Sequence, residues 1–79
     1  MQIVIEILGM QDCLVEFNVN RAEPEFGISE HVDEFDIIEI SGRIPSDASR
    51  RATHSHIRNA HGEYDRIVKL CEEAAGLYV

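Results

Sequence analysis

Residues 2–20, QIVIEILGMQDCLVEFNVN, decide the fold that the sequence predicts. Residues 2–8 and residues 13–20 each alternate between two faces, and both segments are rich in the β-branched residues that favour strands. Between them, residues 9–12 (GMQD) contain Gly and Asp, which tolerate the backbone angles that a chain reversal needs. Two alternating segments around a short Gly-containing loop are typical of a β-hairpin.

A third strand is predicted for residues 35–41, FDIIEIS, and Gly42 ends it. Strict alternation separates its side chains into two sets: Ile38 and Ile40 on one face, and Phe35, Ile37 and Glu39 on the other. This strand would pair with the hairpin and extend it to a three-stranded antiparallel sheet.

The segment between the hairpin and the third strand breaks the alternating pattern. Pro24 and Gly27 stop regular strand pairing there. Ser29 is placed to cap a single helical turn that ends at Asp33, with Glu30 near the positive end of that turn.

The last third of the chain has the spacing of an amphipathic helix, which Ser46 or Ser49 caps at its start and Gly76 ends. The phase of the apolar residues runs through Gly62 without a slip, which favours one long helix of about 28 residues and about 42 Å. A break at Gly62 is the alternative. The apolar positions are Ile57, Ala60, Tyr64, Ile67, Cys71 and Ala74.

The predicted fold is therefore α+β: a three-stranded antiparallel sheet with a long C-terminal helix packed on one face, in a single domain of residues 1–79. The covered face is expected to hold Ile3, Ile5, Ile7, Val15, Phe17 and Val19. The opposite face holds Val4, Leu8 and Leu14 beside Glu6 and Glu16, a mixture that suits water, a dimer or a partner.

Composition limits the class of protein. The sequence contains no run of about 18 apolar residues, and residues 1–9 lack the basic leader of a signal peptide, so a cytoplasmic location is expected. Cys13 and Cys71 are too few for a disulfide framework and are predicted to be reduced packing residues.

The formal charge of −8 is unevenly distributed. Residues 1–42 carry ten acidic residues and one basic residue, whereas residues 43–79 carry five acidic and six basic residues. Long-range charge governs association rather than fold. The acidic half is therefore expected to meet a basic protein or protein complex, and neither nucleic acid nor a membrane.

Residues 23–39, the acidic tract, contain seven carboxylates and no Lys or Arg. One explanation is a solubilising surface, and a second is internal pairing with Arg43, Arg50, Arg51 and Arg58. The third is a docking surface for a basic protein, which would have to gather Glu6, Asp12 and Glu16 beside the tract to approach the charge density of DNA. The predicted partner-binding residues are Glu23, Glu25, Glu30, Asp33, Glu34, Asp36 and Glu39, with Phe26, Phe35 or Ile28 as an apolar anchor.

Other chemistry has little support in the sequence. His54 and His61 would lie about 10.5 Å apart along a continuous helix, and His61 with Asp65 gives two ligands without a third, so no metal site is predicted. Arg51, His54, Arg58 and His61 would form a basic stripe for phosphate or for the acidic half. The chain has no nucleophile elbow and no Gly-rich phosphate loop. Neither catalysis nor a cofactor is expected.

In size, charge and one-domain α+β layout, the chain resembles the small acidic inhibitor proteins that phages and mobile elements encode, of the anti-CRISPR and anti-restriction type. The resemblance implies a non-catalytic protein that docks on a basic, nucleic-acid-binding surface of a host complex, as a nucleic-acid mimic does, and blocks it. The alternatives are a structural or regulatory subunit that forms a homodimer, and an antitoxin that neutralises a basic toxin.

Overall fold

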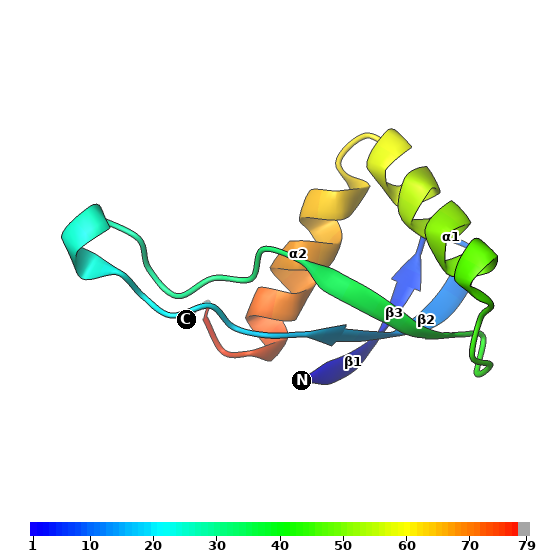
Figure 1. The fold of residues 1–79 in the computed structure, drawn as a ribbon, viewed down its shortest axis with the longest axis horizontal. Helices are drawn as coiled ribbons and strands as arrows, with labels where there is room; N and C mark the ends of the chain where they lie inside the picture. The colour runs from blue at the N-terminus through cyan, green and yellow to red at the C-terminus, as the bar shows by residue number, and fades with distance from the viewer. Residues whose placement is uncertain (78–79) are drawn as a thin grey trace.

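The computed structural model describes residues 1–77, which form an α+β fold in which a three-stranded sheet carries two helices on one face (Figure 1). In chain order the elements are β1 (Gln2–Ile7), β2 (Gln11–Phe17), the 3₁₀ turn η1 (Pro24–Phe26), β3 (Phe35–Ile40), α1 (Asp47–Asn59) and α2 (Glu63–Ala74). The predicted α+β class and the three-stranded antiparallel sheet are confirmed. No helix within these 77 residues combines the length and the apolar character that crossing a bilayer requires.

The sheet has the strand order β1-β2-β3, with both neighbouring pairs antiparallel. The predicted hairpin is present, and its turn occupies residues 8–10 between β1 and β2. Leu8 (φ 58°) and Gly9 (φ 66°) both adopt the left-handed conformation there. Gly accepts this conformation without a steric penalty, which explains why the reversal occurs at this point.

A β-bulge changes the phase of β3. Val15 pairs with Ile37, but the preceding Leu14 pairs with Glu39, so Ile38 is an extra residue on β3. As a result Ile40 packs against the core and Glu39 turns to the opposite face. The strict alternation predicted for this strand is therefore wrong beyond Ile37.

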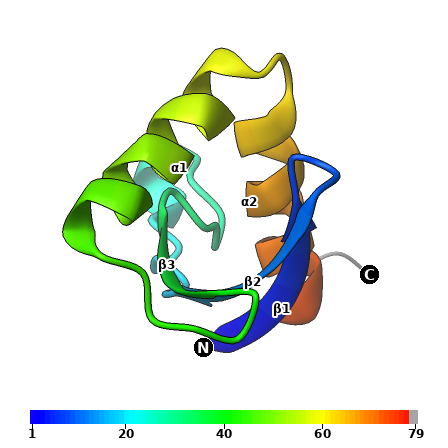
Figure 2. The same cartoon turned by 90° about the vertical axis from the view of Figure 1, so that its right-hand side faces the viewer.

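The single long helix is also wrong, because the chain leaves the helical conformation at Ala60 (ψ 122°) and Gly62 (φ 76°). Gly62 adopts the left-handed conformation that ends one helix and permits a change of direction before the next. The two helices lie over different parts of the sheet, α1 toward β3 and α2 toward β1 (Figure 2). One continuous helix could not cover both parts, so packing against the sheet favours two shorter helices.

The core lies between the sheet and the helices, on the face that the sequence predicts to be covered. From the strands it contains Ile5, Ile7, Cys13, Val15, Phe17, Phe35 and Ile37, and from the helices Ile57, Ile67 and Cys71, with Val32 from the β2–β3 connection. Both cysteines are buried and free, as predicted. Burial raises the pKa of both thiols, that of Cys71 to about 11, which keeps them protonated and inert.

The connection between β2 and β3, residues 18–34, projects from the sheet as an arm (Figure 1). Its two sides pair in antiparallel bridges, Asn20 with His31 and Glu23 with Ile28, and Gly27 (φ 72°) closes the tip. The helical turn predicted from Ser29 to Asp33 is absent, because backbone groups in that segment bond across the arm instead. Every residue from 21 to 30 is exposed.

Candidate functional site

The tip of the arm, Glu23–Ile28, combines exposed apolar and acidic side chains. Phe26 is 72% exposed and Ile28 is 40% exposed, with Glu23 and Glu25 beside them. The backbone of the tip is fixed, since Glu23 N–H donates to Ile28 C=O (2.8 Å) and Ile28 N–H donates to Glu23 C=O (3.1 Å). A large apolar side chain on a preformed turn has the character of a binding anchor, because little conformational entropy is lost on contact.

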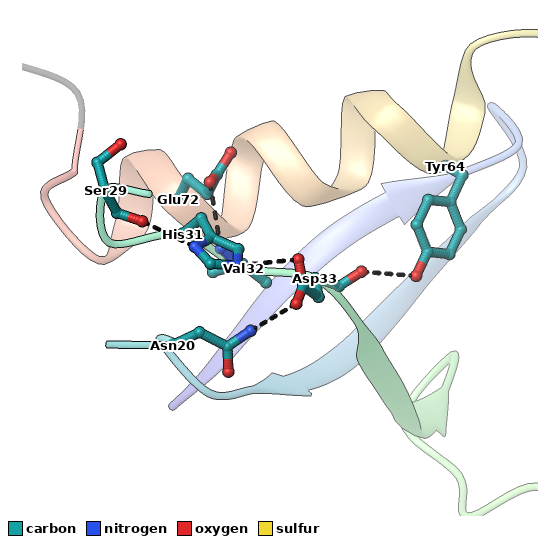
Figure 3. Close-up of polar contacts among 7 residues, drawn as sticks. All are labelled: Asn20, Ser29, His31, Val32, Asp33, Tyr64 and Glu72. Atoms are coloured by element: carbon teal, nitrogen blue, oxygen red, sulfur yellow. Dashed lines mark hydrogen bonds and ion pairs between the residues drawn. The ribbon is translucent and has the colours of Figure 1, made fainter. Parts of the chain in front are cut away.

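Polar contacts around Asp33 fasten the base of the arm (Figure 3). The Asp33 carboxylate accepts from Asn20 Nδ2 (2.8 Å) and lies 3.1 Å from His31 Nε2, while the Asp33 carbonyl accepts from the Tyr64 hydroxyl (2.8 Å). Val32, buried beside it, donates its N–H to the Glu72 carboxylate on α2 (3.1 Å). The arm is thus bound to the helix layer, and Asp33 has a structural role that the sequence did not reveal.

His31 responds to pH through this cluster. Its Nδ1 lies 2.8 Å from the Ser29 carbonyl and its Nε2 faces Asp33, so both ring nitrogens meet oxygen acceptors. Only the protonated imidazole donates from both nitrogens. The hydrogen bond to Ser29 and the Asp33 carboxylate raise the pKa of His31 above its ordinary value of 6.5.

A titration of the four histidines by NMR should find His31 above pH 6.5 and His54 below it, because burial lowers the pKa of His54. Since the pKa of His31 is raised in the fold, its stabilising effect is complete below pH 6.5 and is lost as the pH rises through the folded pKa. His54 serves as the internal control with the opposite shift. The reverse order of the two pKa values would contradict the geometry of the arm base.

The open face of the sheet gathers acids from all three strands. Cross-strand partners share a face, and the register puts Glu6 opposite Asp12 and Glu16 opposite Asp36. The open acidic face is the set Glu6, Asp12, Glu16, Asp36 and Glu39. This face brings Asp36 and Glu39 of the acidic tract beside Glu6, Asp12 and Glu16, which were not among the predicted site residues. The pairing of Glu6 with Asp12 follows from the hairpin register, which the alternation of the two strands in the sequence already indicates.

Within residues 1–77 none of these five carboxylates forms an ion pair with a Lys or Arg side chain. Arg66, which binds the Glu6 carbonyl, lies close enough to interact electrostatically with the Glu6 carboxylate. Within residues 1–77 the ion pairs join Arg50 to Asp47 (3.7 Å), Arg66 to Glu63 (2.8 Å) and His31 to Asp33 (3.1 Å). Like charges placed directly opposite each other across strands destabilise a sheet. The open acidic face therefore works against folding, and internal ion pairing does not offset it.

The remaining acids of the tract divide between two places. Glu30 lies on the arm, whereas Glu34 lies with Asp36 on one wall of a cavity of about 440 Å³ between β3 and α1, the β3–α1 groove. Arg50, Arg51, His54, Ser55 and Arg58 line the α1 side, with Phe35 and Tyr64 between. Three members of the predicted basic stripe, Arg51, His54 and Arg58, line this groove. The fourth, His61, follows the end of α1 and does not line it.

Phe35 is not available as a contact anchor. Its side chain is 5% exposed and packs in the core, with its ring 5.6 Å from that of His54 and 5.1 Å from that of Tyr64. Of the predicted anchors, Phe26 and Ile28 remain on the surface.

In the described part of the chain, no three His, Cys, Asp or Glu side chains come together in a set that could hold a metal ion.

The predicted site residues thus do not form one patch. They lie on the arm, at its base, on the open acidic face and beside the β3–α1 groove, and Phe35 is in the core. Comparison with protein-family models, with curated proteins and with solved structures finds no match to this chain.

Proposed function

We propose that this protein is a non-catalytic inhibitor that docks by its open acidic face and its arm onto a basic, nucleic-acid-binding surface of a protein complex and blocks that surface. The observation that carries the proposal is the placing of like-charged side chains opposite each other, Glu6 with Asp12 and Glu16 with Asp36, without a direct ion pair to Lys or Arg among the described residues. These like-charged pairs lower the free energy of unfolding, and a role in binding a cationic partner would explain why they are present.

The charge density of the open acidic face supports a nucleic-acid mimic. The six-residue strands β1 and β3 are each about 20 Å long at about 3.3 Å per residue. Five carboxylates over that length give about one charge per 4 Å, close to the spacing of about 3.4 Å along one DNA strand. The acidic tract by itself is sparser, and the sheet supplies the difference by adding Glu6, Asp12 and Glu16.

The arm adds an apolar contact to the electrostatic one. Phe26 lies in the exposed tip of the arm, with Glu23 and Glu25 near it. Aromatic anchors supply most of the affinity in many interfaces, whereas complementary charge raises the association rate and selects the partner. The partner is therefore expected to offer an apolar pocket with a basic rim.

The test is a charge reversal on the open acidic face. The variant Glu16→Lys/Asp36→Lys should associate about 10–100 times more slowly with a partner recovered by pull-down, since it removes the attracting field. The control Asp65→Lys/Glu73→Lys makes the same change in net charge at exposed positions of α2. Stopped-flow rates at low and high salt, with circular dichroism to check the fold, give the comparison.

Two results would contradict the proposal. The first is an association rate that is the same at low and high salt, because an electrostatically steered encounter must slow as salt screens it. The second is an equal loss of rate in the α2 control. In addition, DNA or RNA that binds the recovered partner should compete with this protein for it.

The alternative of a homodimer through the open face is disfavoured by the same charges, because a two-fold axis would bring two sets of five carboxylates together. Val4, 68% exposed, offers little apolar area to offset that repulsion. A mass measurement in solution decides this point. An antitoxin that neutralises a basic toxin would use the same electrostatics with a different partner, and the pull-down distinguishes the two.

A further inference from the structure

The β3–α1 groove combines a basic rim with an aromatic surface. Its α1 wall carries Arg51 and Arg58, which are both exposed, and within residues 1–77 neither of them forms an ion pair. His54 and Tyr64, both half-buried, line the groove between that wall and β3. These four side chains are therefore accessible to a group that enters the groove.

The arm tip carries the complementary groups. Phe26 is 72% exposed, and Glu23 and Glu25 lie beside it. A cavity of about 150 Å³ can hold a benzene molecule, so the groove of about 440 Å³ has room for a phenyl ring. Guanidinium groups bind both the face of an aromatic ring and a carboxylate. Each exposed group of the tip thus has a counterpart in the groove.

The tip cannot reach the groove of its own chain. Hydrogen bonds to Tyr64 and Glu72 fasten the base of the arm to α2. From there the arm runs along the longest dimension of the molecule, which measures 40 Å against 23 and 22 Å for the other two, and carries the tip away from α1 (Figure 1). A tip that enters such a groove must therefore belong to another molecule.

We propose that the arm tip of a second copy of this chain occupies the β3–α1 groove, and that the exchange is reciprocal, so that the assembly closes as a dimer. The lining of the groove includes Glu34, the last residue of the arm, so each groove lies beside the base of its own arm. A two-fold axis between two antiparallel arms then brings each tip to the groove of the other copy. This inference rests on the arm and the groove and does not depend on the proposed function.

The charges of the two walls orient the tip in the groove. Glu34 and Asp36 on the β3 wall repel Glu23 and Glu25 of the entering tip, whereas the arginines of α1 attract them. The carboxylates of the tip therefore turn toward α1. Because the acidic arms also repel each other and the contact is small, the dimer should be weak, with a Kd of about 10–100 µM.

Sedimentation equilibrium at near-physiological salt tests the dimer over roughly 1 µM to 1 mM protein. The mass should be that of the monomer, 9.0 kDa, at the low end and should double at the high end. Phe26→Ala should weaken the dimer by about tenfold or more. The matched control is Ile44→Ala, because Ile44 is 78% exposed and lies outside both the arm and the groove. It should change the Kd by less than about threefold.

A charge exchange between two variants identifies the contact. The arm-reversed variant is Glu23→Lys/Glu25→Lys, and the groove-reversed variant is Arg51→Glu/Arg58→Glu. Each alone should dimerise at least about tenfold more weakly than the parent. An equimolar mixture of the two should dimerise again, because it can pair each native tip with a native groove and each reversed tip with a reversed groove.

Two controls make the same changes in net charge outside the arm and the groove. They are Glu6→Lys/Asp12→Lys, on the open acidic face, and Arg43→Glu/Lys69→Glu, at exposed positions. Each should keep the Kd of the parent within about threefold, and the first also tests for a dimer through the open face. Circular dichroism checks that all the variants remain folded.

Five results would overturn the proposal. They are a monomer up to about 1 mM, a doubled mass already at about 1 µM, a mass that rises beyond the dimer, a mixture of the reversed variants that stays monomeric, and an equal loss in the controls. A doubled mass at the lowest concentration would indicate a larger interface elsewhere on the molecule.

Discussion

The Phe17→Ala variant is expected to lose about 3–5 kcal/mol of unfolding free energy, the usual cost of removing a buried phenylalanine. Phe17 is 2% exposed, and it lies on the central strand with β1 on one side and Phe35 opposite on the other. A chain of 79 residues has a total stability of roughly 4–12 kcal/mol. The substitution therefore removes a large share of the stability, and at the lower end of this range it unfolds the domain.

Phe26 provides the matched control, since the same substitution there removes a ring that is 72% exposed. Phe26→Ala should change the unfolding free energy by no more than about 0.5 kcal/mol. Urea denaturation followed by circular dichroism measures both variants. Similar losses in the two would mean that the arm tip is packed against the body of the protein, contrary to the structure.

The Glu63→Ala variant should lose about 1.5–3 kcal/mol, the range for hydrogen bonds to charged groups. The Glu63 carboxylate, 13% exposed, accepts from the N–H of Leu8 (2.6 Å) and from Arg66 Nε (2.8 Å). Arg66 in turn covers the edge of β1 at Glu6. One side chain thus links the start of α2 to the hairpin turn, and its removal leaves the Leu8 N–H without an acceptor.

The same substitution should alter the response to acid. The hydrogen bond from Arg66 lowers the pKa of Glu63 from its ordinary value of 4.5. A carboxylate with a lowered folded pKa stabilises the protein above its unfolded pKa, and this stability is lost as the pH falls through the folded value. Glu63→Ala should therefore weaken the dependence of stability on pH below about 4.5. Urea denaturation of the variant and the parent across this pH range measures the difference.

The strands and the face they bury could be predicted from the sequence, because alternation of apolar residues depends only on the chain itself. Residues such as Ile5, Val15 and Phe17 are buried as predicted. The position of the acids of the hairpin could in principle be derived from the same alternation. The burial of Phe35 also follows from its phase with Ile37, so the prediction that Phe35 is a surface anchor is wrong.

The remaining features depend on contacts between distant segments. The break at Gly62 cannot be read from the apolar phase, because it follows from Ile57 and Ile67 both finding places over the sheet. The anchoring of the arm depends on Tyr64 and Glu72 of α2, far along the chain from residues 18–34. Local propensity near Ser29 favoured a helical turn, and cross-arm hydrogen bonds outweighed it.

The extra residue in β3 has a genetic consequence. With Ile38 present, Glu39 faces water and Ile40 faces the interior. Loss of the Ile38 codon would restore the regular pleat and would keep the present pairs, Glu39 with Leu14 and Ile40 with Cys13, on their present faces. The strand is therefore expected to tolerate a deletion at this one position, whereas a one-residue slip elsewhere in its pairing would exchange the two faces.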